Sequence, residues 1–473
     1  MTKLILIFSD GTGQRGGLRP DQKLSNVYKL YRATRAGPDS NINPSQQTAF
    51  YDPGLGRGEV GGWTFKRARQ GLEAMIGTGI DTNIVDCYAQ IISRYNPGDK
   101  ICLFGFSRGA YTVRALASLM NLCGVPTKMP DGSPVPQHGK ELRKIAEEAV
   151  FNVYNHGAGR PRGMAPFFQQ REELGRRFRL KYESHQNNDP KAPRGNVEPH
   201  FIGVFDTVAA LGSAKLKTLF GVVLGVLIAP LIATFFFDVP LLILAPVVGL
   251  TVVVVYWWIR TLLRSRKVFR PLSTEVKESE EINSALSKRH VHWAFWKNKN
   301  YDRYLSGQVK YARHALAIDE ERASFPRVEW GMKATAERKK NQKPRWLKQV
   351  WFAGCHSDIG GSYAEDESRL SDIALTWLVE ELKECVPNIQ VRDELLQTFG
   401  DPAGLQHREI FMIPNLLRWK LKSRTVDDAG ELHVSVIERL DSGPVPVMNK
   451  VEQYRPEQLS SHPAVNKYYV EKS

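Results

Sequence analysis

The stretch ICLFGFSRGAYTVRALA, residues 101–117, decides how this chain folds. Its first four residues are apolar and predict a buried strand, and after Gly109 apolar residues recur at helical spacing. Ser107 stands between them on the pattern G-x-S-x-G, where glycine lets the chain turn sharply and pass close to itself. A strand, a turn and a helix in this order are typical of a nucleophile elbow, whereas the bare pattern would also fit an ordinary tight turn. We therefore predict that Ser107 is a nucleophile.

A serine nucleophile needs a base, and the base needs an acid that orients it. Two strand-like runs end in such residues, because residues 200–205 lead to Asp206 and residues 349–355 lead to His356. In open α/β sheets, sites form where strands end. We expect His356 to accept the Ser107 proton and Asp206 to orient the imidazole, although Asp206 would also suit a turn and His356 an ordinary loop. Weaker candidates are Asp358 for the acid, and His314 and His433 for the base.

A second glycine-rich turn, SDGTG at residues 9–13, follows the apolar run at residues 4–8. A loop of this kind can direct backbone N–H groups at a developing negative charge. We expect the oxyanion site to involve Gly11, Thr12 and Asp10, with the amide of Arg108 as a further donor. The pattern is neither a P-loop nor a dinucleotide fingerprint. Asp10 would also suit a metal, but no cluster at ligand spacing accompanies it, so we expect no metal and no organic cofactor.

Six segments together resemble the α/β-hydrolase family that includes the bacterial type VI secretion phospholipase effectors and their uncharacterised relatives. They are FSDGTG, YDPGLG, GFSRGAYTVRALA, FDTVAALG, ARHALAIDE and WFAGCHSDIGGSY, beginning at residues 8, 51, 105, 205, 312 and 351. The resemblance implies a serine esterase or lipase with Ser107, Asp206 and His356 as its triad. One departure is Ser362, which stands where the family usually has the last glycine of H-S-D-V-G-G-G. The resemblance does not fix the substrate.

Two apolar runs predict a membrane hairpin inserted in this fold. Residues 219–237 and 239–259 are each close to the roughly 20 residues that span a bilayer, and Asp238 separates them. Aromatic residues 256–258 suit a membrane interface, and the basic flanks favour cytoplasmic ends. We therefore expect two spans in the inner (cytoplasmic) membrane and a cytoplasmic catalytic domain. A re-entrant hairpin and a buried hairpin of a soluble core are the alternatives.

Length and cysteine content fit one large domain with additions. The chain has 473 residues, and its cysteines at 87, 102, 123, 355 and 385 form no C-x-x-C pair, which suits a reducing compartment. The first apolar run is too short for a signal peptide. The expected organisation is a core in two parts, 1–213 and 268–385, a hairpin insert at 214–267 and a C-terminal extension at 386–473.

The charge balance predicts an anionic partner. There are 65 basic and 50 acidic residues, a net charge of +15. Basic clusters beside a membrane segment attract anionic lipid head groups, so we expect membrane lipids as partners and no nucleic acid. A phospholipase must be kept from damaging its own membrane, so we also expect a control such as a regulatory protein or a homo-oligomer.

The sequence thus predicts an α/β-hydrolase-like sheet with flanking helices, interrupted by a two-helix transmembrane hairpin. The expected function is that of a membrane-anchored serine hydrolase cleaving lipid ester bonds, above all a phospholipase. One alternative is a tethered esterase or thioesterase that acts on a soluble substrate. Another is a non-catalytic membrane scaffold or a toxin-like, membrane-disrupting protein.

Overall fold

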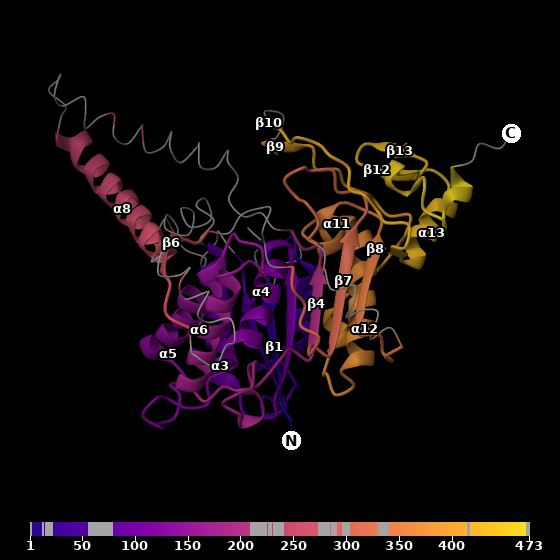
Figure 1. Ribbon diagram of the computed structural model, residues 1–473. Coiled ribbons are helices and arrows are strands. Elements are labelled where there is room, and N and C mark those ends of the chain that lie inside the picture. The colour runs from indigo at the N-terminus through magenta and orange to yellow at the C-terminus, as the bar shows by residue number, and fades with distance from the viewer. Residues whose placement is uncertain are drawn as a thin grey trace.

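Seven parallel strands form the central sheet of the protein in the computed structural model (Figure 1). The structure describes residues 2–11, 14, 22–54, 79–208, 225, 229, 241–272, 284, 291–295, 303–328, 330, 339, 341–413 and 417–469. The strands are β1 (Leu4–Ser9), β2 (Gln47–Asp52), β3 (Lys100–Phe106), β4 (Phe201–Phe205), β7 (Tyr311–Ala317), β8 (Leu347–Phe352) and β11 (Glu431–Leu432). Their spatial order is β11-β8-β7-β4-β3-β1-β2, and every neighbouring pair is parallel. This architecture confirms the predicted α/β class.

Helices cover both faces of the sheet. The α-helices of the described residues are α1 (Asn26–Thr34), α3 (Gly79–Arg94), α4 (Ser107–Cys123), α5 (Gly139–Glu147), α6 (Phe167–Lys181), α8 (Leu241–Ser265), α11 (His356–Gly360), α12 (Arg369–Cys385) and α13 (Val434–Asp441). One core layer joins α3, α4, α5 and α6 to the sheet, and the other joins α1 and α12 to its opposite face. In Figure 1 the first group lies beside the N-terminal strands, and α12 lies behind β7 and β8.

The alternation of side chains along the strands builds these two layers. Ile5 and Ile7 of β1 point into the layer of α3 and α4, whereas Leu6 and Phe8 point into the layer of α1 and α12. All six residues of β1 are buried. Strands buried on both faces are nearly continuous apolar runs, which explains why residues 4–8 show no polar alternation.

The direction in which strands are added reverses between β1 and β3, because β2 lies on one side of β1 and all later strands lie on the other. Ligand sites of open α/β sheets form at such a switch point, outside the carboxyl ends of the strands. The register pairs Ser9 of β1 with Gly105 of β3. The loop after β1 and the turn after β3 therefore leave the sheet at the same level.

The described residues also form smaller elements. The two-stranded ribbons are β5 (Arg266–Val268) with β6 (Val291–Trp293), β9 (Phe411–Ile413) with β10 (Leu417–Arg418), and β12 (Val445–Val447) with β13 (Lys450–Glu452). Short helices are η1 (Glu148–Val153), η2 (Tyr154–Gly157), η3 (Gln186–Asn188), η4 (Glu365–Glu367), η5 (Asp393–Leu395), η6 (Glu457–Leu459) and η7 (Asn466–Tyr468). From the C-terminal region, β11 joins the sheet edge, and α13 packs on Trp351 in a third core cluster.

The predicted membrane hairpin finds no support in the described residues. Its first run, residues 219–237, lies almost wholly outside them, and its second run falls on α8, whose interior contains Pro246. Within the described part of the chain, no helix has the length and apolar character needed to cross a membrane. Figure 1 shows α8 projecting away from the sheet and its covering helices.

A buried ion pair ties β7 to α12. The Arg313 guanidinium is fully buried, and its Nε lies 2.5 Å from a carboxylate oxygen of Glu381, which Lys348 also contacts. Removing one partner of a buried pair leaves an uncompensated charge, which costs far more than breaking an exposed pair. This explains why the ARHALAIDE segment carries an arginine inside a buried strand.

Glu381→Gln should therefore destabilise the protein by about 3 kcal/mol or more, measured by urea unfolding at neutral pH. The control is Asp393→Asn, which breaks the exposed Lys383–Asp393 pair at 2.8 Å and should cost less than about 1 kcal/mol. Equal effects of the two changes would show that the buried pair has no special role.

Candidate active site

The turn between β3 and α4 has the conformation of a nucleophile elbow. Ser107 adopts a φ of 57°, a left-handed conformation that is strained for any residue with a side chain. A Cβ on Gly109 would lie 2.0 Å from the Ser9 carbonyl oxygen, and one on Gly105 would lie 2.6 Å from Ala110 Cα. Because both obstacles are backbone atoms, no side chain can replace either glycine without moving the chain. The predicted turn is thus present, with Ser107 at the first position of α4.

Asp206 and His356, which are far apart in the sequence, meet beside this turn. Asp206 directly follows β4, and His356 opens α11 just after β8. The Nδ1 atom of His356 lies 2.5 Å from Oδ2 of Asp206, and both residues are buried. The amide of Val208 donates to the carbonyl of Ser107 at 3.4 Å, which ties the segment after β4 to the elbow. The structure therefore pairs Asp206 with His356 and places the imidazole against Phe106, the residue that precedes Ser107.

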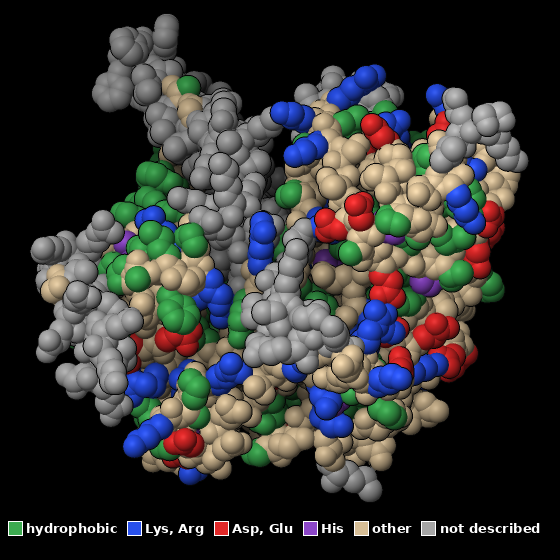
Figure 2. All heavy atoms as spheres, turned by 45° about the vertical axis from the view of Figure 1, so that its right-hand side comes forward, with side chains coloured by type: hydrophobic (Ala, Val, Ile, Leu, Met, Phe, Trp, Pro, Cys, Tyr) green, Lys and Arg blue, Asp and Glu red, His purple; other side chains and the backbone are tan. Residues whose placement is uncertain are grey.

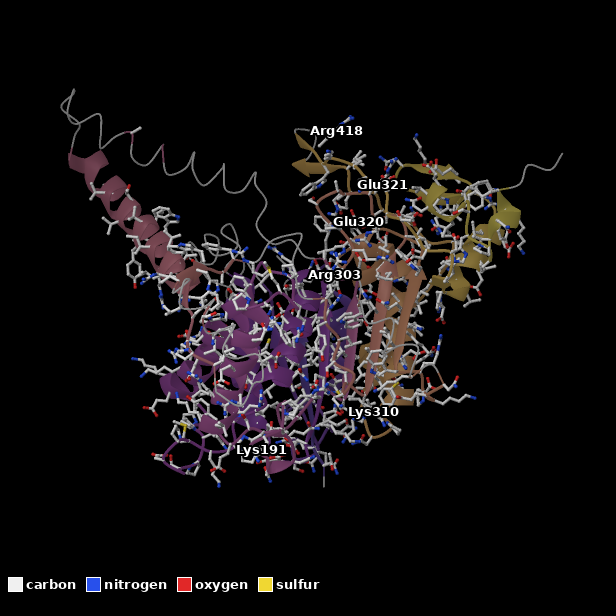
Figure 3. The ribbon with its side chains drawn as sticks, viewed as in Figure 1. Lys191, Arg303, Lys310, Glu320, Glu321 and Arg418 are labelled. Atoms are coloured by element: carbon white, nitrogen blue, oxygen red, sulfur yellow. The ribbon has the colours of Figure 1, made fainter. Side chains whose placement is uncertain are left out.

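The other ring nitrogen of His356, Nε2, is not used in the contact with Asp206. Nε2 is buried and has no hydrogen-bond partner among the described residues. The rings of Phe106 and Phe325 pack against the imidazole, with centroid distances of 4.7 and 5.2 Å. The amide of His356 donates to Glu320 at 3.2 Å, and Glu320 in turn pairs with Arg322 at 2.8 Å. Figure 3 shows Glu320 above the carboxyl ends of the strands, where it can hold this backbone.

Arg424 is a site residue that the sequence did not reveal. Its guanidinium donates to both carboxylate oxygens of Asp206, at 2.6 and 3.0 Å, and to the carbonyls of Ala317 and Phe325. Burial alone would raise the pKa of Asp206, but Arg424 and His356 outweigh it and hold that pKa well below its usual range. Both neighbours therefore favour the charged carboxylate. No local motif marks Arg424, which lies 218 residues from its partner.

Asp10, in the loop after β1, fixes the position of that loop through hydrogen bonds. Asp10 accepts hydrogen bonds from the Tyr51 hydroxyl at 2.7 Å, from the Gly11 amide at 2.7 Å and from Ser25. Burial raises the pKa of Asp10 to about 6, although these three hydrogen bonds lower it. A Cβ on Gly11 would lie 3.3 Å from Ser107 Cβ, so the loop does lie against the elbow.

Of the predicted oxyanion donors, the amide of Gly11 is therefore already bound to Asp10. Thr12 lies outside the described residues. The amide of Arg108 is among the first N–H groups of α4, which have no acceptor within the helix. In the described part of the chain, no three His, Cys, Asp or Glu residues gather in a way that could hold a metal ion.

The weaker candidates have other partners. Asp358 caps the start of α11 by accepting from the amide of Cys355, and it also binds His407 at 2.7 Å. His314 is buried, accepts from the Thr207 amide at 3.1 Å, and has a pKa lowered to about 3, chiefly by burial. His433 caps α13. The distances therefore favour Asp206 and His356 over these alternatives.

Comparison with known proteins identifies a family for most of the chain. The family model described as "T6SS, Phospholipase effector Tle1-like, catalytic domain" matches residues 3–230 and 275–381, well over half of the chain. An uncharacterized protein of Saccharomyces cerevisiae is 27% identical over 219 residues, which are 44% of this chain and 27% of the yeast protein. A crystal structure of an uncharacterized protein from Pseudomonas aeruginosa is 16% identical, with a TM-score of 0.34, over 84% of this chain and 49% of that one. The chain thus spans about a quarter of the length of the yeast protein and about half of that of the Pseudomonas protein.

Ser362 replaces a glycine that this loop favours. It adopts a φ of 98°, and its hydroxyl is buried without a hydrogen-bond partner among the described residues. Ser362→Gly should therefore stabilise the protein by about 1 kcal/mol, since it relieves backbone strain and removes an unsatisfied polar group. Urea unfolding measures the change.

The matched control is Ser460→Gly, at a position with a φ of −58°, where serine is unstrained. That change should destabilise the protein, because glycine there adds freedom to the unfolded chain and loses the exposed hydrogen bond from the Ser460 hydroxyl to the Glu457 carbonyl at 2.8 Å. If Ser362→Gly is also destabilising, the loop is not strained at this position.

Proposed function

Because the chain belongs to the family of type VI secretion Tle1-like phospholipase effector catalytic domains, we propose that it hydrolyses carboxylic ester bonds of phospholipids with Ser107 as the nucleophile. The observation that carries the serine mechanism is the buried pair of Asp206 and His356 beside the strained Ser107. His356 donates through Nδ1 to the carboxylate, which leaves its unpartnered Nε2 as the basic nitrogen. An acid–base pair of this kind beside a serine supports the proposal of a catalytic triad.

The proposed reaction has two halves. The Ser107 hydroxyl adds to the acyl carbonyl while His356 Nε2 takes its proton, and Asp206 stabilises the resulting imidazolium. The tetrahedral intermediate then collapses, the ester C–O bond breaks, and the leaving alcohol takes the proton from His356. Water repeats the sequence on the acyl-enzyme, releasing a fatty acid and regenerating Ser107. We propose that residues 1–213 and 268–385 form the catalytic core and that the C-terminal extension contributes Arg424.

Donors at the start of α4 support stabilisation of the oxyanion. The amide of Arg108 follows the nucleophile directly, and the N-terminus of a helix favours negative charge. The amide of Gly11 is bound to Asp10, so Gly11 is not proposed as an oxyanion donor. Its role in the site is that the absence of a side chain lets the loop approach Ser107. Asp10, held by Ser25 and Tyr51, keeps this loop in place.

The triad is tested by Ser107→Ala, Asp206→Ala and His356→Ala. Each should lower kcat for fatty-acid release from phospholipid in mixed micelles by about 10⁴-fold or more, and a double variant should be hardly worse than a single one. A fluorophosphonate probe should label the wild type at Ser107 and leave Ser107→Ala unlabelled. His433→Ala, which changes a histidine that caps α13, is the control and should keep full activity.

Activity that survives His356→Ala but not His314→Ala would contradict this assignment of the base. A different outcome would be labelling of Ser107 and turnover of a water-soluble ester or thioester, but no turnover of phospholipid. That result would support the serine mechanism and contradict the proposal that the substrate is a lipid.

Arg424 is proposed as a positioning residue that keeps Asp206 charged. In Arg424→Gln, burial of Asp206 is no longer offset by the guanidinium, so its pKa rises. Since Asp206 must be ionised to orient His356, the acid limb of the kcat/KM profile should move to higher pH, and activity should be lost first at acid pH. In Arg424→Lys the acid limb should move less than in Arg424→Gln, because lysine keeps a positive charge beside Asp206.

The matched control is Arg408→Gln, which breaks a similar two-bond pair with Glu321 at 2.6 and 3.1 Å on the surface. Its pH profile should be unchanged. A uniform loss of activity at every pH in Arg424→Gln would indicate a structural role only.

A further inference from the structure

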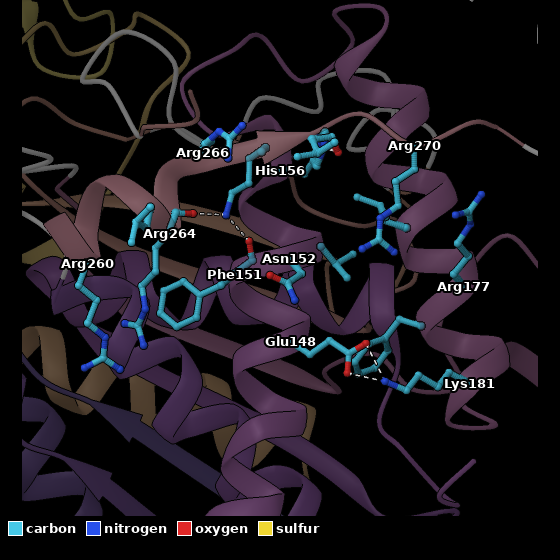
Figure 4. A pocket seen from close by; sticks show the side chains of 16 residues that line it. Glu148, Phe151, Asn152, His156, Arg177, Lys181, Arg260, Arg264, Arg266 and Arg270 are labelled. Carbon is cyan, nitrogen blue, oxygen red and sulfur yellow. Dashed lines mark hydrogen bonds and ion pairs between the residues drawn. The ribbon is translucent and has the colours of Figure 1, made fainter. Parts of the chain in front are cut away.

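A cavity of about 760 Å³ lies at the foot of α8, and none of its lining residues belongs to the Ser107 site (Figure 4). It is formed by η1, α6, the last turns of α8 and the segment that follows α8. Seven of its lining side chains are basic and one, Glu148, is acidic. Two of the basic residues come from α6, Arg177 and Lys181. The others are Arg260, Arg264, Arg266, Lys267 and Arg270.

Carboxylates offset only part of this positive charge. Lys181 pairs with Glu148 at 2.8 Å and Arg177 with Glu173 at 2.7 Å, while Arg264 lies 3.8 Å from Glu147. The side chains of Arg266 and Arg270 are exposed and form no ion pair or hydrogen bond with the described residues. The cavity therefore keeps cationic groups that an anion can bind.

Lys267 adds a buried cation that is held by neutral groups. Its Nζ donates to the Phe151 carbonyl at 2.6 Å and to the Arg264 carbonyl. Burial lowers the pKa of Lys267 to about 8, and the charge of the Asp81 carboxylate offsets only part of this effect. A bound anion would offset more of it.

An apolar stripe on α8 leads down to this cavity. Val252, Tyr256, Ile259 and Leu263 recur at intervals of four, three and four residues and are 61%, 57%, 47% and 64% exposed. Leu263 also lines the cavity. The neighbouring β5–β6 ribbon exposes Val268, Val291 and Trp293. Figure 2 shows hydrophobic side chains gathered around the foot of α8, with basic side chains close by.

We propose that this cavity binds the phosphate of an anionic phospholipid in a bilayer, while the exposed stripe of α8 and the β5–β6 ribbon contact the lipid surface. Basic groups next to exposed apolar and aromatic side chains supply the two signals that stable attachment to an anionic membrane requires. A soluble phosphate would neutralise the arginines but leave the stripe in water, so the lipid source explains both features. The inference rests on the proposed function only in that the bilayer would also hold the substrate.

Binding is measured by flotation with vesicles of phosphatidylcholine, with and without phosphatidylglycerol, using the full chain carrying Ser107→Ala so that no lipid is consumed. The chain should float only with the anionic vesicles. The added double change Arg266→Gln and Arg270→Gln should weaken this binding by about 30-fold, as expected for two basic residues at an anionic surface. Leu263→Ser should also weaken it, because the apolar contact is lost.

The charge-matched control is Lys191→Gln with Lys310→Gln, which removes two exposed cations at the lower end of the view in Figure 3, away from α8, and should leave binding unchanged. Equal losses in both double variants would mean that net charge alone drives attachment, and the cavity would have no role. Calorimetric binding of inorganic phosphate without recruitment to vesicles would overturn the lipid source. Because the assay measures binding and not turnover, its result does not depend on whether Ser107, Asp206 and His356 form a catalytic triad.

Discussion

Asp206 carries its carboxylate at the end of β4 with no exposed surface, where a charge without a partner would cost several kcal/mol. Three groups from distant segments compensate the charge: the His356 imidazole at the start of α11, the guanidinium of Arg424 and the amide of Ala317. Each contact also fixes the position of its donor. One buried charge therefore orders the ends of β4, β7 and β8 and part of the C-terminal region around the elbow that carries Ser107.

The parallel sheet makes this convergence possible. All its strands end at one edge, and the reversal between β1 and β3 opens that edge at the loop of Asp10 and the turn of Ser107. Gly109 allows the two segments to touch backbone to backbone, and Gly105 allows the elbow to turn back on itself. The strain at Ser107 is sustained because β3 and α4 are packed on both sides of it.

The protein carries two polar centres of different chemistry. At the sheet edge, cations and a carboxylate compensate each other and leave one imidazole nitrogen unpaired. At the foot of α8, cations outnumber carboxylates and lie next to exposed apolar side chains. The first arrangement suits proton transfer in a closed site, and the second suits attraction of a charged surface. A lipid hydrolase would need both, since its substrate has to be withdrawn from a bilayer.

The sequence by itself determined the local elements and their order. Apolar runs predicted β1, β3, β4 and β8, the elbow pattern predicted the turn at Ser107, and residues at strand ends predicted that Asp206 and His356 would meet. Only the tertiary structure decided that Arg424 clamps Asp206, that the Gly11 amide is bound to Asp10, and that residues 148–181 and 260–270 enclose a basic cavity. Sequence patterns report the conformation of neighbouring residues, because backbone propensity and hydrophobic periodicity act over a few residues. Which distant segments meet depends on the order of strands in the sheet and on the packing of the C-terminal region, and no local pattern encodes either.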